Sequence, residues 1–271
     1  MNALRLAALC VGALLIASLT GGAVRSAHAA AVHRPPGYAG PARDRQMRDG
    51  TGSLASRNWA GYVAYDQAED TDFNVIKSTW VEPAVTCEAS NAWTVFWVGL
   101  DGWFDGTVEQ GGSSAQCVGG VPQYTLWWEM FPTNSIQTMN AISPGDTITA
   151  SVTYNPGTAK FQIKVRDVTT GTGFTRNEKC ASDQTCDRSS TDVIAEDVGK
   201  FGGSTYFPLA DYGTMQFSKS TSTDVNGTSG GFTKPAWEYA AITEQSGKKI
   251  YATVSALSHQ GKTFSATWQH R

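Results

Sequence analysis

Residues 159–167 read AKFQIKVRD, and apolar and polar side chains alternate along them without a break. In an extended chain, Phe161, Ile163 and Val165 point to one face, and the Lys, Gln and Arg residues between them point to the other. One apolar face is typical of a strand in an antiparallel sheet that covers a core on one side. The stretch therefore predicts a half-buried antiparallel strand.

The same alternation recurs in TITASVTY (147–154), KIYATVSAL (249–257) and KTFSATW (262–268), and clusters of Gly, Asn, Asp, Ser or Pro separate these runs. No stretch has the apolar spacing of a helix of three turns. Many strands of moderate length joined by short turns predict an all-β fold. We expect an antiparallel two-sheet β-sandwich of the concanavalin A-like or jelly-roll type.

Residues 1–29 have the features of a secretory signal peptide. Arg5 precedes an apolar run from Leu6 to Leu19, and the small residues Ala27 and Ala29 mark a cleavage site. The run is too short for a transmembrane anchor, and no later stretch approaches about 18 uninterrupted apolar residues. We expect a secreted, extracellular protein without a membrane anchor.

Residues 30–57 form a basic leader or propeptide, rich in Gly, Pro and Arg and without an apolar period. They carry five Arg against two Asp, a net charge of +3, whereas residues 58–271 carry 14 Lys and Arg against 22 Asp and Glu, a net charge of −8. The leader either masks a site before processing or is merely disordered. Residues 58–271 predict a single domain, and we expect it to be a monomer. Its net negative charge argues against nucleic acid as a partner.

Four cysteines remain once the signal peptide is removed, an even number that suits an oxidising compartment. Four cysteines allow three pairings. We favour Cys87 with Cys117 and Cys180 with Cys186, because each is the nearest partner in the chain.

The histidines and motifs exclude several kinds of chemistry. Residues 58–271 contain two histidines, His259 and the penultimate His270. A catalytic triad with a Ser or Cys nucleophile needs a histidine base, so such a triad is not expected here. HExxH and paired CxxC motifs are absent, which argues against a metal, and no glycine-rich loop opens a helix to hold a phosphate. We expect no cofactor. Carboxylates and amides remain for chemistry, namely Glu109, Gln110, Glu129, Asp192, Glu196 and Asp197.

Two stretches place such groups among apolar side chains. If TDVIAEDV (191–198) is a strand, Asp192 and Glu196 share one face, while LWWEMFP (126–132) sets Glu129 in an aromatic run. A carboxylate in such surroundings needs a partner or a raised pKa, although structural salt bridges remain an alternative. Neighbouring Trp127 and Trp128 face opposite ways on a strand, so we expect one of them to face a groove or solvent.

The sequence resembles the glutamic peptidases, also called eqolisins, which are secreted acid peptidases. The resemblance rests on motifs in a shared order, which are NWAGYV (58–63), WVEP (80–83), FWVGLDG (96–102), TVEQGG (107–112), YTLWWEMFP (124–132) and TDVIAEDV (191–198). It implies an acid endopeptidase acting on polypeptide substrates. The resemblance also implies a catalytic pair, Gln110 and Glu196, and the substrate-binding residues Trp97, Asp101, Trp127 and Glu129. This chain departs from the family at Thr191-Asp192-Val193, where Ala-Glu-Trp or Ala-Glu-Phe is common.

Gly111 and Gly112 follow Gln110 directly, and two interpretations stay open for them. They would let a substrate backbone approach closely, or they would form a plain bulge or turn. Two other functions also stay open. A glycoside hydrolase on a jelly-roll sandwich would use Glu129 and Glu196 as its carboxylates, and a carbohydrate-binding module would use the aromatic side chains alone.

Overall fold

A computed structural model describes residues 37–42, 46–47, 54–66, 71–200 and 205–270 of the chain. The predicted signal peptide lies outside these residues. The described part of the chain contains strands, turns and loops and no helix. It follows that no helix of this part could cross a membrane.

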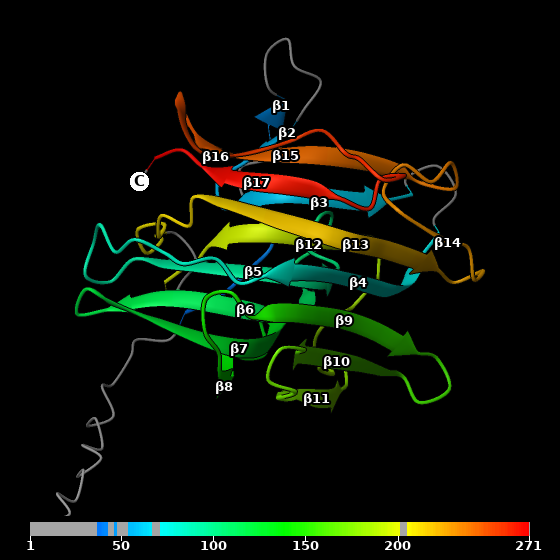
Figure 1. The fold of residues 1–271 in the computed structure, drawn as a ribbon. Coiled ribbons are helices and arrows are strands. Elements are labelled where there is room, and N and C mark those ends of the chain that lie inside the picture. The colour runs from blue at the N-terminus through cyan, green and yellow to red at the C-terminus, as the bar shows by residue number, and fades with distance from the viewer. Residues whose placement is uncertain (1–36, 43–45, 48–53, 67–70, 201–204, 271) are drawn as a thin grey trace, which may run out of the picture. The chain divides into compact units, whose positions relative to one another are not determined.

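The strands form two layers. The first layer has the hydrogen-bonded order β8–β7–β6–β5–β12–β3–β15, with β2 and β1 beyond β15. Its strands are β1 (Gln46–Met47), β2 (Leu54–Ser56), β3 (Trp59–Tyr65), β5 (Trp93–Leu100), β6 (Val108–Val118), β7 (Val121–Phe131), β8 (Gln137–Ala141), β12 (Ser190–Asp197) and β15 (Glu238–Ser246). Strands β3, β12, β5, β6 and β7 follow one another down Figure 1.

The second layer has the order β11–β10–β9–β4–β13–β17–β16, with the short β14 paired to β13. Its strands are β4 (Phe73–Val81), β9 (Thr147–Asn155), β10 (Lys160–Asp167), β11 (Gly173–Glu178), β13 (Thr214–Asp224), β14 (Ser229–Gly230), β16 (Lys249–Val254) and β17 (Phe264–Trp268). The β15–β16 hairpin joins the layers along one edge. All these pairs are antiparallel except β2–β15, so the predicted antiparallel sandwich is confirmed.

The alternation seen in the sequence sets which side chains enter the core. Phe161, Ile163 and Val165 of β10 are buried and join a cluster with Phe96 and Val193 of the first layer. This cluster fills the space between the layers, where β4 packs on β5 and β12, and β9 packs on β5 and β6. All four stretches of alternating sequence are strands, namely β9, β10, β16 and β17.

A second apolar cluster covers the other face of the first layer. Its members come from the first-layer strands and from adjoining loops, and they include Trp59, Trp97, Trp127 and Ile194. Trp127 is buried on this face, whereas Trp128 packs half-buried against the cluster between the layers. The two neighbouring tryptophans therefore face opposite ways, as predicted.

Both favoured disulfides are present. Cys87 is bonded to Cys117 and Cys180 to Cys186. The first bond ties a loop to the end of β6, and the second closes a short loop before β12. The nearest-partner interpretation of the four cysteines is confirmed.

Candidate active site

The register of four neighbouring strands brings the polar side chains of the first layer together. Asp192 of β12 lies opposite Gly99 of β5, Gly99 opposite Gln110 of β6, and Gln110 opposite Glu129 of β7. Directly opposed residues share one face of a sheet, and so do residues at even spacing along one strand. Glu196 lies four residues beyond Asp192, so it joins the same face. Glycine suits position 99 between these polar residues, because a Cβ there would lie only 2.7 Å from the Trp97 ring and would collide with it.

The carboxyl group of Glu196 is fully buried and accepts three hydrogen bonds. Trp97 Nε1 donates to Oε2 at 2.8 Å, and Asn58 Nδ2 and the backbone N–H of Gly40 donate to Oε1 at 2.8 Å and 3.0 Å. Burial raises the pKa of Glu196 well above its usual range, while the three donors act in the opposite direction. The site therefore fixes the orientation of both carboxyl oxygens.

Gln110 and Glu129 bind one residue of the leader. The Gln110 side-chain NH2 donates to the Ala39 carbonyl oxygen, and the Ala39 N–H donates to Glu129 Oε2 at 2.9 Å. Burial raises the pKa of Glu129, and the nearby Glu196 charge acts in the same direction. Gln110 and Glu196 thus hold the two ends of one peptide group, the carbonyl of Ala39 and the N–H of Gly40.

The other predicted substrate-binding residues lie in two places. Trp97 and Trp127 are buried in the same apolar cluster as Ala39, and Trp127 Nε1 donates to the Ser113 carbonyl at 2.8 Å. Asp101 is buried beyond the end of β5, where its Oδ1 accepts from the backbone N–H of Ser189 at 2.7 Å. Burial raises the pKa of Asp101 to about 7. The structure brings Trp97 and Glu129 to Glu196 and Gln110, and Asp101 has different partners.

Sequence reasoning missed the part played by Asn58 and Trp59. Asn58 donates to Glu196, and Trp59 Nε1 donates to the Gly40 carbonyl oxygen at 2.9 Å. Both residues stand at the start of the NWAGYV motif, and that motif was the sequence feature that could have pointed to a role in the site. Their partners are distant in sequence and could not be inferred from it.

The turn or bulge interpretation of Gly111 and Gly112 is wrong, and the close approach of a substrate backbone stays a prediction. The two residues lie inside β6, where the pairing runs on without a register shift, so they form neither a turn nor a bulge. A Cβ at Gly111 would lie 2.6 Å from Ile163 of the second layer, and one at Gly112 would lie 1.9 Å from the Phe96 carbonyl oxygen. These glycines allow close packing of the layers and of neighbouring strands.

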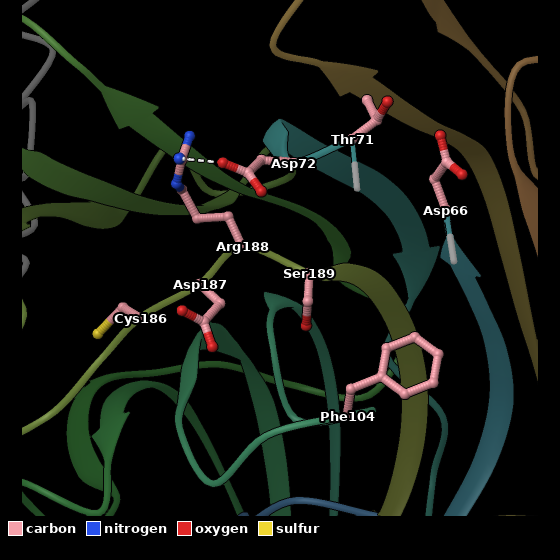
Figure 2. A pocket seen from close by; sticks show the side chains of 8 residues that line it. All are labelled: Asp66, Thr71, Asp72, Phe104, Cys186, Asp187, Arg188 and Ser189. Atoms are coloured by element: carbon pink, nitrogen blue, oxygen red, sulfur yellow. Dashed lines mark hydrogen bonds and ion pairs between the residues drawn. The ribbon is translucent and has the colours of Figure 1, made fainter. Parts of the chain in front are cut away.

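A surface pocket of about 540 Å³ lies away from Gln110 and Glu196. Figure 2 shows its lining, in which Arg188 pairs with Asp72, the side chain of the adjacent Ser189 points away from that pair, and Phe104 lies below. Ser189 connects this pocket to the Asp101 region through its backbone N–H. Within the described residues, no three His, Cys, Asp or Glu side chains are grouped as metal ligands would be.

The buried carboxyls predict a fold that is more stable in acid. Burial raises the pKa of Asp101 to about 7 and that of Glu82 to about 8, and it raises those of Glu129, Asp192 and Glu196 as well. A group with a raised pKa in the folded state stabilises the fold below its unfolded pKa, and this contribution is lost as the pH rises through the folded pKa. For one such group, a tenfold difference in acidity between the folded and unfolded states corresponds to roughly 1.4 kcal/mol of folding free energy.

We therefore expect the free energy of unfolding, measured by urea denaturation, to fall by several kcal/mol between pH 4 and pH 8. Glu82→Gln should flatten part of this decline, because it removes a buried group that titrates in that window. The exposed Glu238→Gln serves as the control and should leave the slope unchanged. Stability that rises from pH 4 to pH 8 would contradict the raised pKa values.

Comparison with known proteins gives one family and one fold. The model of the peptidase A4 family matches residues 57–267. Scytalido-glutamic peptidase, solved with a transition state analog inhibitor, superposes with a TM-score of 0.67 at 22% identity, over 79% of this chain and 98% of that one. Aspergilloglutamic peptidase from Aspergillus niger gives a TM-score of 0.56 at 20% identity, over 66% and 99% of the two chains.

SCP-B, described as a member of the eqolisin family and solved with the tripeptide Ala-Ile-His, gives a TM-score of 0.64 at 22% identity, over 79% of this chain and 98% of that one. No curated protein matches the chain. At these identities the solved structures support the sandwich fold, and the family model carries the assignment of the chain to a family.

Proposed function

The chain belongs to the peptidase A4 family, and from this premise we propose that it is a secreted acid endopeptidase in which Gln110 and Glu196 activate water against a peptide bond. One observation carries the proposal. The side chains of Gln110 and Glu196 hydrogen-bond to the carbonyl and the N–H of a single peptide group. Two groups that reach both ends of a peptide bond are placed to act on its carbonyl carbon and its nitrogen.

Glu196 supplies the acid–base chemistry. As a carboxylate it takes a proton from the attacking water, and as a carboxylic acid it returns that proton to the leaving nitrogen. The Gly40 N–H, 3.0 Å from Glu196 Oε1, marks where such a nitrogen lies. The donors from Trp97 and Asn58 favour the ionised form of Glu196, which opposes the effect of burial on its pKa.

Gln110 stabilises the oxyanion. Its NH2 group donates to the carbonyl oxygen that becomes negatively charged when water adds to the carbon. Its own Oε1 is buried and has no hydrogen-bond partner among the described residues, so this oxygen can accept a hydrogen bond from the attacking water. An amide is neutral at every pH and keeps both roles in acid.

Glu129 and Trp127 would hold the substrate on the acyl side. Glu129 Oε2 accepts the N–H of the residue whose carbonyl contacts Gln110, which is a backbone contact that any polypeptide can make. Trp97 and Trp127 contribute to the apolar cluster around that residue. Their substrate-binding role, and that of Asp101, stay predictions.

A glycoside hydrolase would use Glu129 and Glu196 as its two carboxylates. Here these carboxylates accept hydrogen bonds from the N–H groups of Ala39 and Gly40, two consecutive residues of a polypeptide. Together with the family assignment, these contacts favour a peptide over a sugar as the substrate.

Export and acid activity complete the proposal. The N-terminal segment with signal-peptide features and the two disulfides support secretion. The buried carboxyls of Glu82 and Glu129, whose pKa values are raised by burial, stay neutral in acid, which supports a fold that works there.

The direct test is to incubate the purified protein with a denatured protein between pH 3 and pH 7 and to map the cuts by mass spectrometry. We expect endoproteolysis that is strongest in acid and is unaffected by reagents against serines, by reagents against thiols or by chelators. Activity that a chelator or a serine reagent abolishes would contradict the proposed mechanism.

Trp97→Phe should weaken the enzyme without unfolding it. The change removes the Nε1 donor to Glu196 Oε2 and keeps an aromatic ring beside Trp59. Because that donor lowers the pKa of Glu196, its loss should move the acidic limb of the pH–kcat profile to higher pH. We expect kcat to fall about 10-fold, in line with the loss of one hydrogen bond to a charged group. An unchanged pH profile would show that Trp97 does not position Glu196.

A further inference from the structure

The leader segment 37–42 runs through the candidate active site. Tyr38 and Gly199 exchange backbone hydrogen bonds at 3.0 Å and 2.9 Å, the Ile136 N–H donates to the Gly37 carbonyl at 2.9 Å, and the Ala42 N–H donates to the Gly102 carbonyl at 3.1 Å. Each end of the segment is therefore fixed by backbone contacts. Such contacts depend little on the identity of the side chains, so they hold any extended polypeptide in this path.

The central residues of the segment contact the proposed catalytic groups. The Ala39 carbonyl accepts from Gln110, the Gly40 N–H donates to Glu196, and the Gly40 carbonyl accepts from Trp59. The Pro41 carbonyl accepts from Asn58 Nδ2 at 3.2 Å. With the segment in place, Gln110 and Glu196 are fully buried, so no other polypeptide reaches them until it leaves.

We propose that Ala39–Gly40 is the peptide bond that the enzyme hydrolyses in its own leader, within the same molecule. This inference rests on the proposed function, since it uses the same Gln110 and Glu196, and it adds the identity of the first substrate. Cleavage separates the leader up to residue 39 from the rest of the chain and leaves Gly40 as a free end in the candidate active site.

The reaction balances with water as the one co-reactant. Water adds to the carbonyl carbon of Ala39, its proton passes to the Glu196 carboxylate, and Gln110 donates to the oxyanion. Glu196 then protonates the Gly40 nitrogen, and the C–N bond breaks. The products are a carboxyl group on Ala39 and an amino group on Gly40.

The residues around this bond fit a site for small side chains. Ala39 is fully buried within the cluster that holds Trp97 and Trp127. A Cβ at Gly40 would lie 3.2 Å from the Phe131 ring, tighter than ordinary contact. A Cβ at Gly37 would lie 2.4 Å from the Trp93 ring. We therefore expect foreign substrates to be cut preferentially between small residues as well.

The test follows the full chain, purified at neutral pH, after a shift to acid. Intact-mass and N-terminal analysis should show a new chain that begins at Gly40, and its rate of formation should not change over a 100-fold range of protein concentration, because the bond is already seated in its own molecule. Full-length Glu196→Gln should stay uncut at this bond.

A matched pair of variants tests the position. Ala39→Leu overfills the buried site and should slow formation of the Gly40 terminus about 10-fold or more, since overpacking is costly. Ala256→Leu makes the same change at an exposed residue after β16, outside the leader, and it should process within about twofold of the wild type.

The outcomes separate this inference from the proposed function. If the enzyme cuts a denatured protein but its own new terminus lies elsewhere, or if processing accelerates with protein concentration, the inference is overturned and the peptidase function stands. The same holds if the leader stays uncut and acts only as an inhibitor. If neither the leader nor the denatured protein is cut at any acidic pH, the proposed function itself fails.

Discussion

Gln110→Ala should lower kcat/KM for a peptide substrate about 10²- to 10³-fold, the usual cost of losing one oxyanion donor. In the structure this side chain donates to the carbonyl oxygen of the peptide group that lies at Glu196. Alanine removes both that donor and the Oε1 that we assign to the attacking water. The loss should appear in kcat more than in KM, because the oxyanion exists in the transition state and not in the bound substrate.

The leader must be removed by the same route from every variant, because it covers the site and an inactive variant cannot process itself. A recognition sequence for a specific protease, placed in residues 48–53, allows this. Gln162→Ala, at an exposed position of β10, is the matched control and should retain full activity. If processed Gln110→Ala is as active as the control, Gln110 has no part in the mechanism.

Glu196→Gln should have an effect at least as large, with kcat falling about 10²- to 10⁴-fold, the range typical of general acid–base catalysis. Glutamine keeps the size of the side chain and its acceptor for Trp97 Nε1, but it cannot exchange a proton. The pH profile of the residual activity should lose the limb that reports the ionisation of Glu196.

Stability is a second readout for the same substitution. A neutral amide does not titrate, but its NH2 group cannot accept the hydrogen bonds that Asn58 Nδ2 and the Gly40 N–H donate to Glu196 Oε1. Because burial raises the pKa of Glu196, we expect the stability of the wild type to fall more steeply from pH 4 to pH 8 than that of Glu196→Gln. The exposed Glu238→Gln is the control for both readouts. A fully active Glu196→Gln enzyme would refute the acid–base role.

Much of the fold was predictable because a period of two is a local property. Alternation in residues 147–154 and 159–167 identified β9 and β10, and chain proximity identified both disulfides. The opposite orientations of Trp127 and Trp128 follow from the pleat alone. Each of these features depends on residues that are close in the sequence.

The features that the sequence did not reveal depend on distant residues. Gly111 packs against Ile163 of the second layer, and Gly112 packs against the Phe96 backbone. The local sequence does not reveal either neighbour. Trp97 is a donor to Glu196, 99 residues away along the chain. The leader has no period at all, and backbone hydrogen bonds, which leave little signature in a sequence, hold its residues 37–42 in the candidate active site.

The central claim is that Gln110 and Glu196 act together on one water and one peptide bond, and a double-mutant cycle tests it most directly. The kcat/KM of the processed wild type, Gln110→Ala, Glu196→Gln and the double variant is measured on one peptide in acid. Because groups that act as a unit are not additive, the double variant should lose little more than the worse single variant. Losses that multiply, or a single variant with full activity, would contradict the account.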